Sequence, residues 1–212
     1  MLEYKRFVFN EFAENTYVIY DTKTLQAAIV DPGCNSLREE NMLQQFIEQK
    51  ALHVKYLINT HCHLDHIMGN KFVVDTYKPV FYAPEKDIFL LNESPNHAMM
   101  YGVPFTPSPL PNEYITEDTQ IEIGSMKPKF LFTPGHTPGE YCLYFNEYGV
   151  LFSGDVLFEE SIGRSDLPGG NQATLLESIH KKLLFLPDET IILPGHGENT
   201  TIGNEKMNNP FI

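Results

Sequence analysis

What the sequence lacks limits where the chain can work. No apolar run approaches the length that spans a membrane, and no basic start followed by an apolar segment marks the N-terminus for secretion. Cysteine is scarce, and Cys34, Cys62 and Cys142 are scattered and odd in number, which indicates reduced thiols rather than a disulfide framework. These absences predict a cytoplasmic protein with no membrane partner.

Basic residues are also few. The chain has 15 Lys and Arg against 28 Asp and Glu, a formal net charge of −13, and its basic residues form no cluster in sequence. A protein of this charge is repelled by a polyanion unless its cations gather on one face. The composition therefore excludes nucleic acid as a partner and favours a solvated acidic surface.

The length and the apolar pattern predict one α/β (α+β) domain over residues 1–212. A hydrophobic content of 42% and a charged content of 20% are those of a globular protein with one sizeable core. Two sheets packed face to face with helices outside fit this order of elements. Short apolar runs predict early antiparallel strands at 7–9, 16–20 and 27–30. Caps and apolar spacing predict helices at 36–50, 67–77 and 172–185.

The most informative stretch is residues 61–66, His-Cys-His-Leu-Asp-His. With this composition the pattern H-x-H-x-D-H arises by chance in about one such sequence in two thousand. The cluster follows a short apolar run, which is typical of a buried strand, and ligand sites in α/β sheets lie at the carboxyl ends of strands. Three further runs end in the same way: 130–132 before His136, 150–152 before Asp155, and 190–193 before His196.

The donor types in these positions predict a metal centre. The alternating spacing aims His61 and His63 at one ion, while Asp65 and His66 can turn toward a second. Imidazole and carboxylate donors without a thiolate suit Zn²⁺, Fe²⁺, Mn²⁺ or Co²⁺ rather than a closed structural zinc site. The set exceeds what one tetrahedral ion needs, so we expect two divalent ions, with zinc first and iron or manganese as alternatives. Cys62 is expected to be a small buried spacer. The remaining histidines are interpreted as ordinary polar residues: His53, His97 and His180.

Residues 92–113 are rich in proline, which predicts a long connection without regular structure. Its apolar and aromatic side chains leave two interpretations open. Either the segment walls a substrate pocket, with Met99 and Tyr101 as substrate contacts, or it is a surface loop pinned by its aromatic rings.

Taken together, these motifs resemble those of the metallo-β-lactamase superfamily, over essentially the whole chain. The resemblance rests on residues 61–66, Thr133-Pro134-Gly135-His136-Thr137, Ser153-Gly154-Asp155 and Pro194-Gly195-His196. It implies a four-layer αββα sandwich. It also implies a ligand set for two ions: His61, His63 and His136 for one, Asp65, His66 and His196 for the other, and Asp155 bridging both.

Within that superfamily the chain is most similar to the glyoxalase II group, through residues 133–139, 163–170 and 194–197. Many β-lactamases of the superfamily have Arg in place of His66 and Cys in place of Asp155, and the diiron flavoproteins have Glu in place of His63 and an added flavodoxin domain. The resemblance therefore disfavours both branches. The chain resembles the short form of glyoxalase II, which lacks the C-terminal helical domain that binds glutathione.

The glyoxalase II resemblance implies a metal-dependent thioesterase acting on a hydroxyacyl thioester such as S-lactoylglutathione. A metal-bridging hydroxide is the expected nucleophile, and Asp65 and Asp155 take the catalytic roles. Arg164 matches a basic residue of the family's glutathione site, but Asp166 lies where the family has Tyr. Arg164 and Asp166 either contact the substrate or form an ion pair that pins their loop. After His196 the chain has Glu198-Asn199 where the family has a further Tyr.

Two other functions remain open at this point. Persulfide dioxygenases share the scaffold, and the resemblance then implies one non-haem Fe²⁺ on His61, His136 and Asp155. The second of these functions is that of a metal-stabilised binding protein without turnover. Lactonase and β-lactamase activities are disfavoured. The acyl group, the thiol carrier and the oligomeric state are not encoded in any pattern of the sequence.

Overall fold

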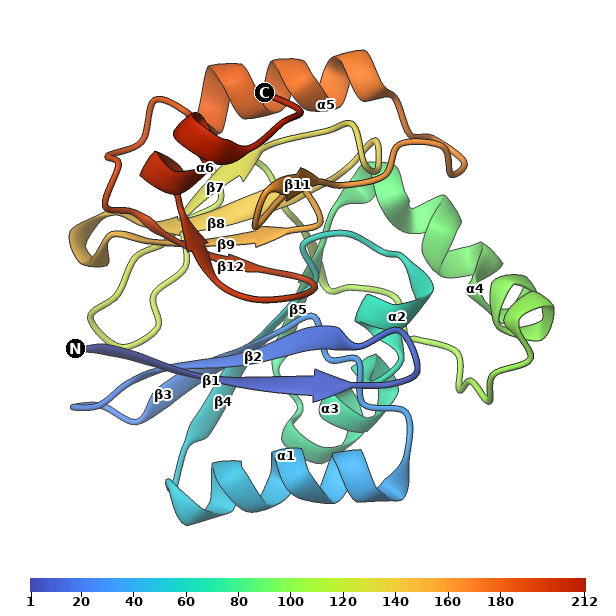
Figure 1. Cartoon of the computed structure of the whole chain (residues 1–212). Helices are drawn as coiled ribbons and strands as arrows, with labels where there is room; N and C mark the ends of the chain where they lie inside the picture. Colours follow the sequence, from blue (N-terminus) through green and yellow to red (C-terminus); the bar gives the residue numbers. More distant parts are fainter. The chain divides into compact units, whose positions relative to one another are not determined.

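The computed structural model describes residues 1–212, which form two compact units. The first comprises Met1–Tyr114 and Ile121–Lys127, and the second comprises Ile115–Gln120 and Pro128–Ile212. Each unit has its own sheet, with its own helices on it (Figure 1).

The first unit contains a six-stranded sheet in the order β1-β2-β3-β4-β5-β6. The antiparallel start predicted from the sequence is confirmed, because β1, β2 and β3 pair antiparallel, whereas β3 to β6 pair parallel. The carboxyl ends of β3 and β4 consequently lie at the same edge. The strands are β1 (Leu2–Phe9), β2 (Glu14–Asp21), β3 (Gln26–Val30), β4 (His53–Ile58), β5 (Val80–Ala83) and β6 (Glu113–Tyr114).

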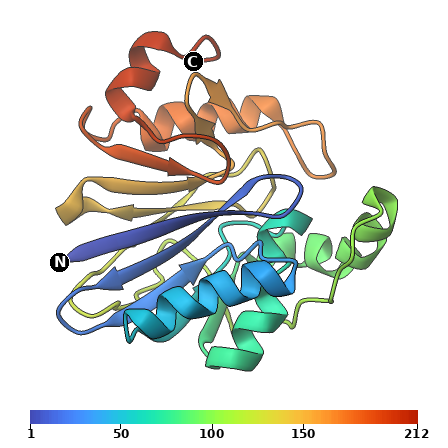
Figure 2. The same cartoon turned by 60° about the horizontal axis from the view of Figure 1, so that its bottom comes forward.

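Two helices cover one face of this sheet, α1 (Leu37–Gln49) and α3 (Asn70–Tyr77) (Figure 2). Their apolar faces bury Leu43 and Val73 in one core cluster with Val18 of β2. Burial of this apolar surface is the main term that holds the helices to the sheet. The prediction of a helix over 36–50 is confirmed, and Ser36 caps it by accepting the backbone N–H of Glu39.

The helix predicted over 67–77 is interrupted in the structure. A short helix, α2 (Leu64–Ile67), precedes α3, and the break between them is at Met68 and Gly69. The Gly69 N–H donates to the Pro32 carbonyl at 2.6 Å, outside any helix. The turn therefore ties the metal-motif segment to the end of β3. The C-terminal limit at residue 77, before Pro79, is as predicted.

The prediction of irregular structure over 92–113 is wrong for its first ten residues. A short 3₁₀ turn (Glu85–Asp87) leads into α4 (Ile88–Tyr101), which runs through Pro95 and changes direction along its length (Figure 1). Proline has no N–H for the carbonyl four residues earlier, that of Leu91. The Ser94 hydroxyl donates to this carbonyl at 2.7 Å and replaces the missing bond.

The second unit contains a five-stranded sheet in the order β13-β12-β9-β8-β7, and a separate hairpin, β10-β11. Because β8 is antiparallel to β7 and β9, and β12 is parallel to β9, the carboxyl ends of β7, β9 and β12 share one edge. The strands are β7 (Lys129–Phe132), β8 (Tyr141–Phe145), β9 (Val150–Gly154), β10 (Leu157–Phe158), β11 (Ser161–Ile162), β12 (Ile191–Pro194) and β13 (Thr200–Thr201).

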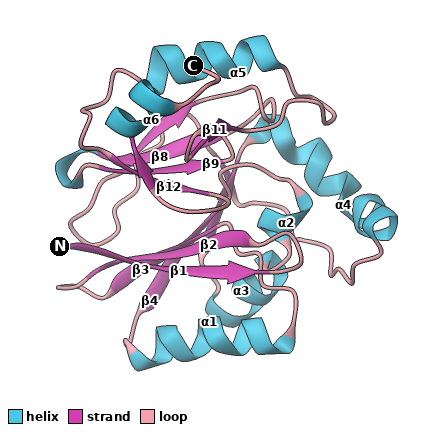
Figure 3. Cartoon of the chain, in the orientation of Figure 1, coloured by secondary structure: helices cyan, strands magenta, loops and turns pink.

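Helices pack on this second sheet as well (Figure 3). The helix predicted over 172–185 is present, but as α5 (Gln172–Ser178) followed by a π-helical turn (Ile179–Leu183). Asn171 caps this helix, since its side chain accepts the Thr174 N–H. Leu175 of α5 joins a core cluster with strand residues and with Ile202 of α6 (Ile202–Asn208). A 3₁₀ turn (Asn146–Tyr148) links β8 to β9.

None of these helices combines the length and the hydropathy that crossing a membrane requires. The three cysteines are buried and unbridged, as the sequence predicts.

Candidate metal centre

In the first unit, the segment after β4 gathers the predicted ligands His61, His63, Asp65 and His66. The ring centroid of His61 lies 4.1 Å from that of His66 and 5.0 Å from that of His63. His61 and His66 are fully buried. Protonated imidazoles packed this closely would repel each other, so the arrangement favours neutral rings whose lone pairs are available to a divalent ion.

The proton of His61 is placed by Thr60 and Asp31. The Thr60 hydroxyl donates to Asp31 Oδ2 at 2.6 Å, so it presents a lone pair to His61 Nδ1 at 3.1 Å. Nδ1 must therefore carry the hydrogen, and Nε2 keeps the lone pair that a metal needs. The Thr60 backbone N–H also donates to Asp31 Oδ1, at 2.7 Å.

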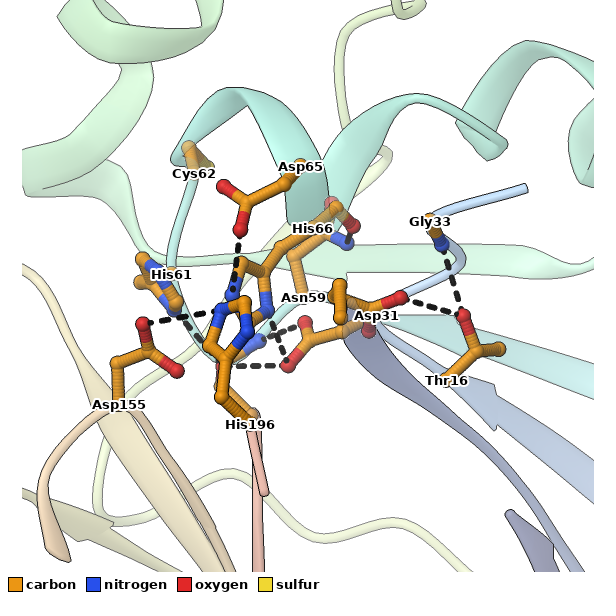
Figure 4. Close-up of polar contacts among 12 residues, drawn as sticks. Thr16, Asp31, Gly33, Asn59, His61, Cys62, Asp65, His66, Asp155 and His196 are labelled. Carbon is orange, nitrogen blue, oxygen red and sulfur yellow. Dashed lines mark hydrogen bonds and ion pairs between the residues drawn. The ribbon is translucent and has the colours of Figure 1, made fainter. Parts of the chain in front are cut away.

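His66 lies between two carboxylates (Figure 4). Its Nε2 is 3.6 Å from Asp65 Oδ2, and its Nδ1 is 3.4 Å from Asp31 Oδ2. Two ligand atoms bound tetrahedrally at about 2.1 Å from one ion are about 3.4 Å apart. The separation of His66 Nε2 from Asp65 is close to that value and exceeds hydrogen-bonding distance, so the pair fits two ligands of one ion.

Asp31 is a residue of the candidate site that the sequence interpretation missed. Asp31, His61 and His66 offer three ligand atoms that lie within 4.8 Å of one another. The signal was available, since Asp31 follows the apolar run of β3 just as the cluster follows β4. The parallel pairing of β3 with β4 brings the two strand ends together.

Polar side chains also hold the backbone of this segment. The Asn59 amide donates to the His66 carbonyl at 3.2 Å and pairs with Asn70, whose amide donates to Ser108 Oγ at 2.8 Å. Asp87 accepts the Cys62 N–H at 3.3 Å. Cys62 itself is fully buried in the core cluster, where burial raises the pKa of its thiol. The prediction that Cys62 is a buried spacer is confirmed.

Because Gly33 has no side chain, its backbone can lie close to Glu14 and to the main chain of Asp65. A Cβ at this position would lie 2.1 Å from Glu14 Oε2 and 2.7 Å from the Asp65 carbonyl. The Asn10 amide donates to the carbonyls of both Gly33 and Asp65. The Gly33 N–H donates to Thr16 Oγ1, whose hydroxyl donates to Glu14 (Figure 4). Burial raises the pKa of the Glu14 carboxyl, and the network keeps Asp65 in place.

In the second unit, the strand ends bring together His136, Asp155 and His196. One carboxylate oxygen, Asp155 Oδ2, is 3.5 Å from His136 Nε2 and 3.6 Å from His196 Nε2. Both separations again approximate the edge of a tetrahedral coordination shell. A single oxygen that faces two imidazoles in this way suits a carboxylate shared between ions, and these residues fit the predicted metal role.

His136 is oriented by main-chain and helix contacts. Its Nδ1 is 2.7 Å from the Arg164 carbonyl, which can only accept, so Nδ1 carries the hydrogen and Nε2 is left for a metal. The Ser178 hydroxyl donates to the Pro134 carbonyl at 2.7 Å and holds the preceding turn. Gly163 permits the close approach, because a Cβ there would lie 1.9 Å from the Asp155 carbonyl oxygen.

Glu140 is a second residue that the sequence interpretation missed. It is fully buried at the start of β8, and its Oε1 accepts the backbone N–H of Asp155 at 2.7 Å. A charge-assisted bond of this kind fixes the main chain from which the Asp155 side chain projects. The available signal was a lone acidic residue directly before a fully apolar strand.

The residues predicted for substrate contact lie in two places. Arg164 and Asp166 form a two-bond ion pair of 2.7 and 2.8 Å on the surface, as one of the two alternatives predicted, and the guanidinium lowers the pKa of Asp166 to about 2. Met99 and Tyr101 are exposed near the end of α4, where the Tyr101 ring packs edge-on against Phe12. Their contact with a substrate remains a prediction.

The chain is similar to known proteins over most of its length. A model of the metallo-β-lactamase superfamily matches residues 10–196. The chain is 40% identical over 207 residues to the hydroxyacylglutathione hydrolase GloC of Haemophilus influenzae, a match covering 95% of this chain and 93% of that protein.

Two solved structures are similar over nearly the whole chain. BLEG-1, a B3 metallo-β-lactamase, has a TM-score of 0.90 and 36% identity, with 99% of each chain covered. TTHA1623, solved in a di-iron-bound form, has a TM-score of 0.87 and 32% identity, with 98% of this chain and 100% of that one covered. The predicted fold class, a mixed α/β fold of the metallo-β-lactamase type, is confirmed by these matches.

Proposed function

Because the chain belongs to the metallo-β-lactamase superfamily, we propose that this metallo-hydrolase cleaves hydroxyacyl thioesters in the manner of glyoxalase II. The observation that carries the proposal is that Asp155 Oδ2 lies 3.5 and 3.6 Å from the Nε2 atoms of two histidines, close to the separation of two ligands on one ion. The thioester class is supported by the relative GloC, whose name describes a hydroxyacylglutathione hydrolase.

In the proposed centre the two halves of the ligand set act together. His61, His63 and His136 would hold one divalent ion, Asp65, His66 and His196 would hold the other, and Asp155 would be a ligand of both. A superfamily match that runs from residue 10 to residue 196 supports this, because it spans all seven of these residues. Zinc is the first choice of metal, and iron and manganese suit the same donors.

Such ions supply a water activated at neutral pH and a positive charge for the carbonyl oxygen of the substrate. The protein itself orients the ligand side chains and supplies carboxylates that balance the charge of the ions. Thr60 and the Arg164 carbonyl fix the imidazoles of His61 and His136 with Nε2 turned to the ions, and Glu140 fixes the backbone of Asp155. Asp65 orients the attacking water through its carboxylate.

The departing group needs no dedicated acid. A thiol has a pKa near about 8.5, so a thiolate leaves readily at neutral pH. This explains why the proposed site can lack a separate proton donor for the leaving group. Arg164, Asp166, Met99 and Tyr101 stay as the proposed substrate contacts, and a small-molecule thioester is the proposed partner. A cytoplasmic location is supported by the three unbridged cysteines.

Oxygen chemistry at iron is the second candidate, as a persulfide dioxygenase with one Fe²⁺ on His61, His136 and Asp155. It is supported by the similar structure of ETHE1 from Myxococcus xanthus, which has a TM-score of 0.80 and 25% identity, whereas TTHA1623 was solved with two irons rather than one. The likeness to BLEG-1 keeps β-lactam hydrolysis among the activities to be assayed.

Substitution of Asp155 tests the proposed function. Asp155→Asn removes the negative charge between His136 and His196, so thioester turnover falls at least a hundredfold and bound metal per chain decreases. Circular dichroism and the unfolding midpoint of the metal-free protein serve as checks that the fold survives. His53→Ala, outside the metal motif, is the matched control and retains activity. A metal-free Asp155→Asn variant with wild-type turnover would overturn the proposal.

A further inference from the structure

A cavity of about 440 Å³ lies within the first unit, apart from the predicted metal ligands. Its walls come from the start of α1, from α3 and from the irregular segment after α4, with Cys34 and Met68 also among the lining residues. The volume falls within the range of pockets that take small organic ligands. No step of the proposed hydrolysis uses this cavity.

The charge of the cavity is set by Glu40. The carboxylate of Glu40 has no hydrogen-bond or ion-pair partner, and partial burial raises the pKa of its carboxyl. The cation in the same cavity, Lys71, is already paired with Asp75 one helical turn away. The three charges sum to −1, and the unpaired one is an anion.

Aromatic and apolar side chains complete the lining, among them Phe72, Phe105 and Met68. An unpaired carboxylate beside phenylalanine rings is a combination that recognises organic cations, through an ion pair and through cation–π attraction. An anionic ligand would instead have to displace Asp75 from Lys71 and to lie near Glu40. The acidic net charge of the chain also attracts cations to its surface.

We propose that this cavity is a binding site for a small organic cation, an ammonium group on an aromatic or aliphatic body, with Glu40 as its counter-ion. The segment that forms one wall is fixed on both sides. The Asn35 amide donates to the Pro104 carbonyl at 2.9 Å, and the Asn70 amide donates to Ser108 at 2.8 Å. The cavity is therefore a built feature of this unit.

Calorimetric titration of the full chain with three matched probes tests the proposal. The probes are 2-phenylethylammonium, its neutral analogue 2-phenylethanol, and the anion 3-phenylpropanoate, all at low ionic strength. We expect one ammonium per chain, bound at least tenfold more tightly than the alcohol, with the anion weakest. Backbone amide shifts in a nuclear magnetic resonance titration should be centred on Lys71, Thr76 and Thr106.

Two variants on α1 separate the effect of Glu40 from general electrostatics. Glu40→Gln should bind the ammonium no better than the alcohol, whereas Glu48→Gln, which removes the same charge outside the cavity, should keep the tenfold preference. Equal binding of all three probes, a preference for the anion, or an unchanged preference in Glu40→Gln would each overturn the assignment. No readout depends on hydrolysis, so the result is independent of the proposed function.

Discussion

At the scale of single residues, the candidate metal centre depends on polar groups that choose which nitrogen of a histidine is available. Asp31 does this for His61 through the Thr60 hydroxyl, and the Arg164 carbonyl does it for His136. A ligand ring with its hydrogen on the wrong nitrogen cannot bind until it changes tautomer or turns over. Loss of these supporting contacts should therefore lower the affinity for the metal.

Removal of the Thr60 hydroxyl tests this role. Thr60→Val keeps the shape of the side chain but loses the bridge between Asp31 and His61, so metal affinity should fall about 10–100-fold. Equilibrium competition with a chelator measures the affinity directly. Thr60→Ser retains a hydroxyl at the same position and should stay near the wild-type value. Wild-type affinity in Thr60→Val would show that the bridge does not orient His61.

Some residues of the candidate site could be predicted from the sequence, and others could not. The grouping of the candidate ligands within each unit could be predicted because these residues follow apolar runs, four of them in a rare pattern. The part played by Arg164 in orienting His136 could not be, because every residue offers a carbonyl and no side-chain pattern reports its direction. Glu140 was hidden for a related reason, since an acidic residue before a strand is usually solvated and here it bonds to the backbone of Asp155.

At the scale of elements, α4 shows how a neighbouring side chain lets proline lie inside a helix. Ser94→Ala should lower the free energy of unfolding by about 1–3 kcal/mol, because the buried Leu91 carbonyl loses its donor. In a Pro95→Ala background the backbone N–H of residue 95 supplies that donor. The serine substitution should then have less than half the effect.

A double-mutant cycle with urea unfolding measures this coupling. The four proteins are the wild type, Ser94→Ala, Pro95→Ala and the double variant, all compared without metal. The same loss for Ser94→Ala in both backgrounds would contradict the compensation by Ser94.

The elements that were predicted correctly share a physical cause. A buried strand such as β9 can be recognised in the sequence as a short apolar run. Proline outweighed the weaker apolar periodicity of α4 in the sequence interpretation. The π-helical turn Ile179–Leu183 was missed because a π-helix occurs mostly as a single turn within an α-helix, and no residue type in the sequence marks it.

At the scale of the whole molecule, acid sensitivity is expected from Asp21. Its buried carboxylate accepts bonds from the N-terminal ammonium of Met1 and from the N–H groups of Lys23 and Ser125. These bonds, the ammonium first, hold the pKa of Asp21 well below its usual range. A lowered folded-state pKa contributes stability that is present above the unfolded pKa of about 3.9 and is lost as the pH falls below it.

Urea unfolding of the metal-free protein between about pH 2 and pH 6 measures this contribution. Metal-free protein is needed because protons also compete for metal ligands. The free energy of unfolding should decline below about pH 4, and Asp21→Asn should make the decline shallower. An equally steep decline in Asp21→Asn would assign the acid sensitivity to other carboxylates.

Metal analysis of the purified protein together with a substrate panel tests most directly the proposal that the chain is a two-metal hydrolase of thioesters. The panel contains S-lactoylglutathione, other thioesters, a β-lactam, a lactone and glutathione persulfide, each with and without oxygen. We predict two metal ions per chain and thioester cleavage that is unaffected by the removal of oxygen. One iron per chain, with sulfite formed from the persulfide only when oxygen is present and no thioester cleaved, would contradict the claim.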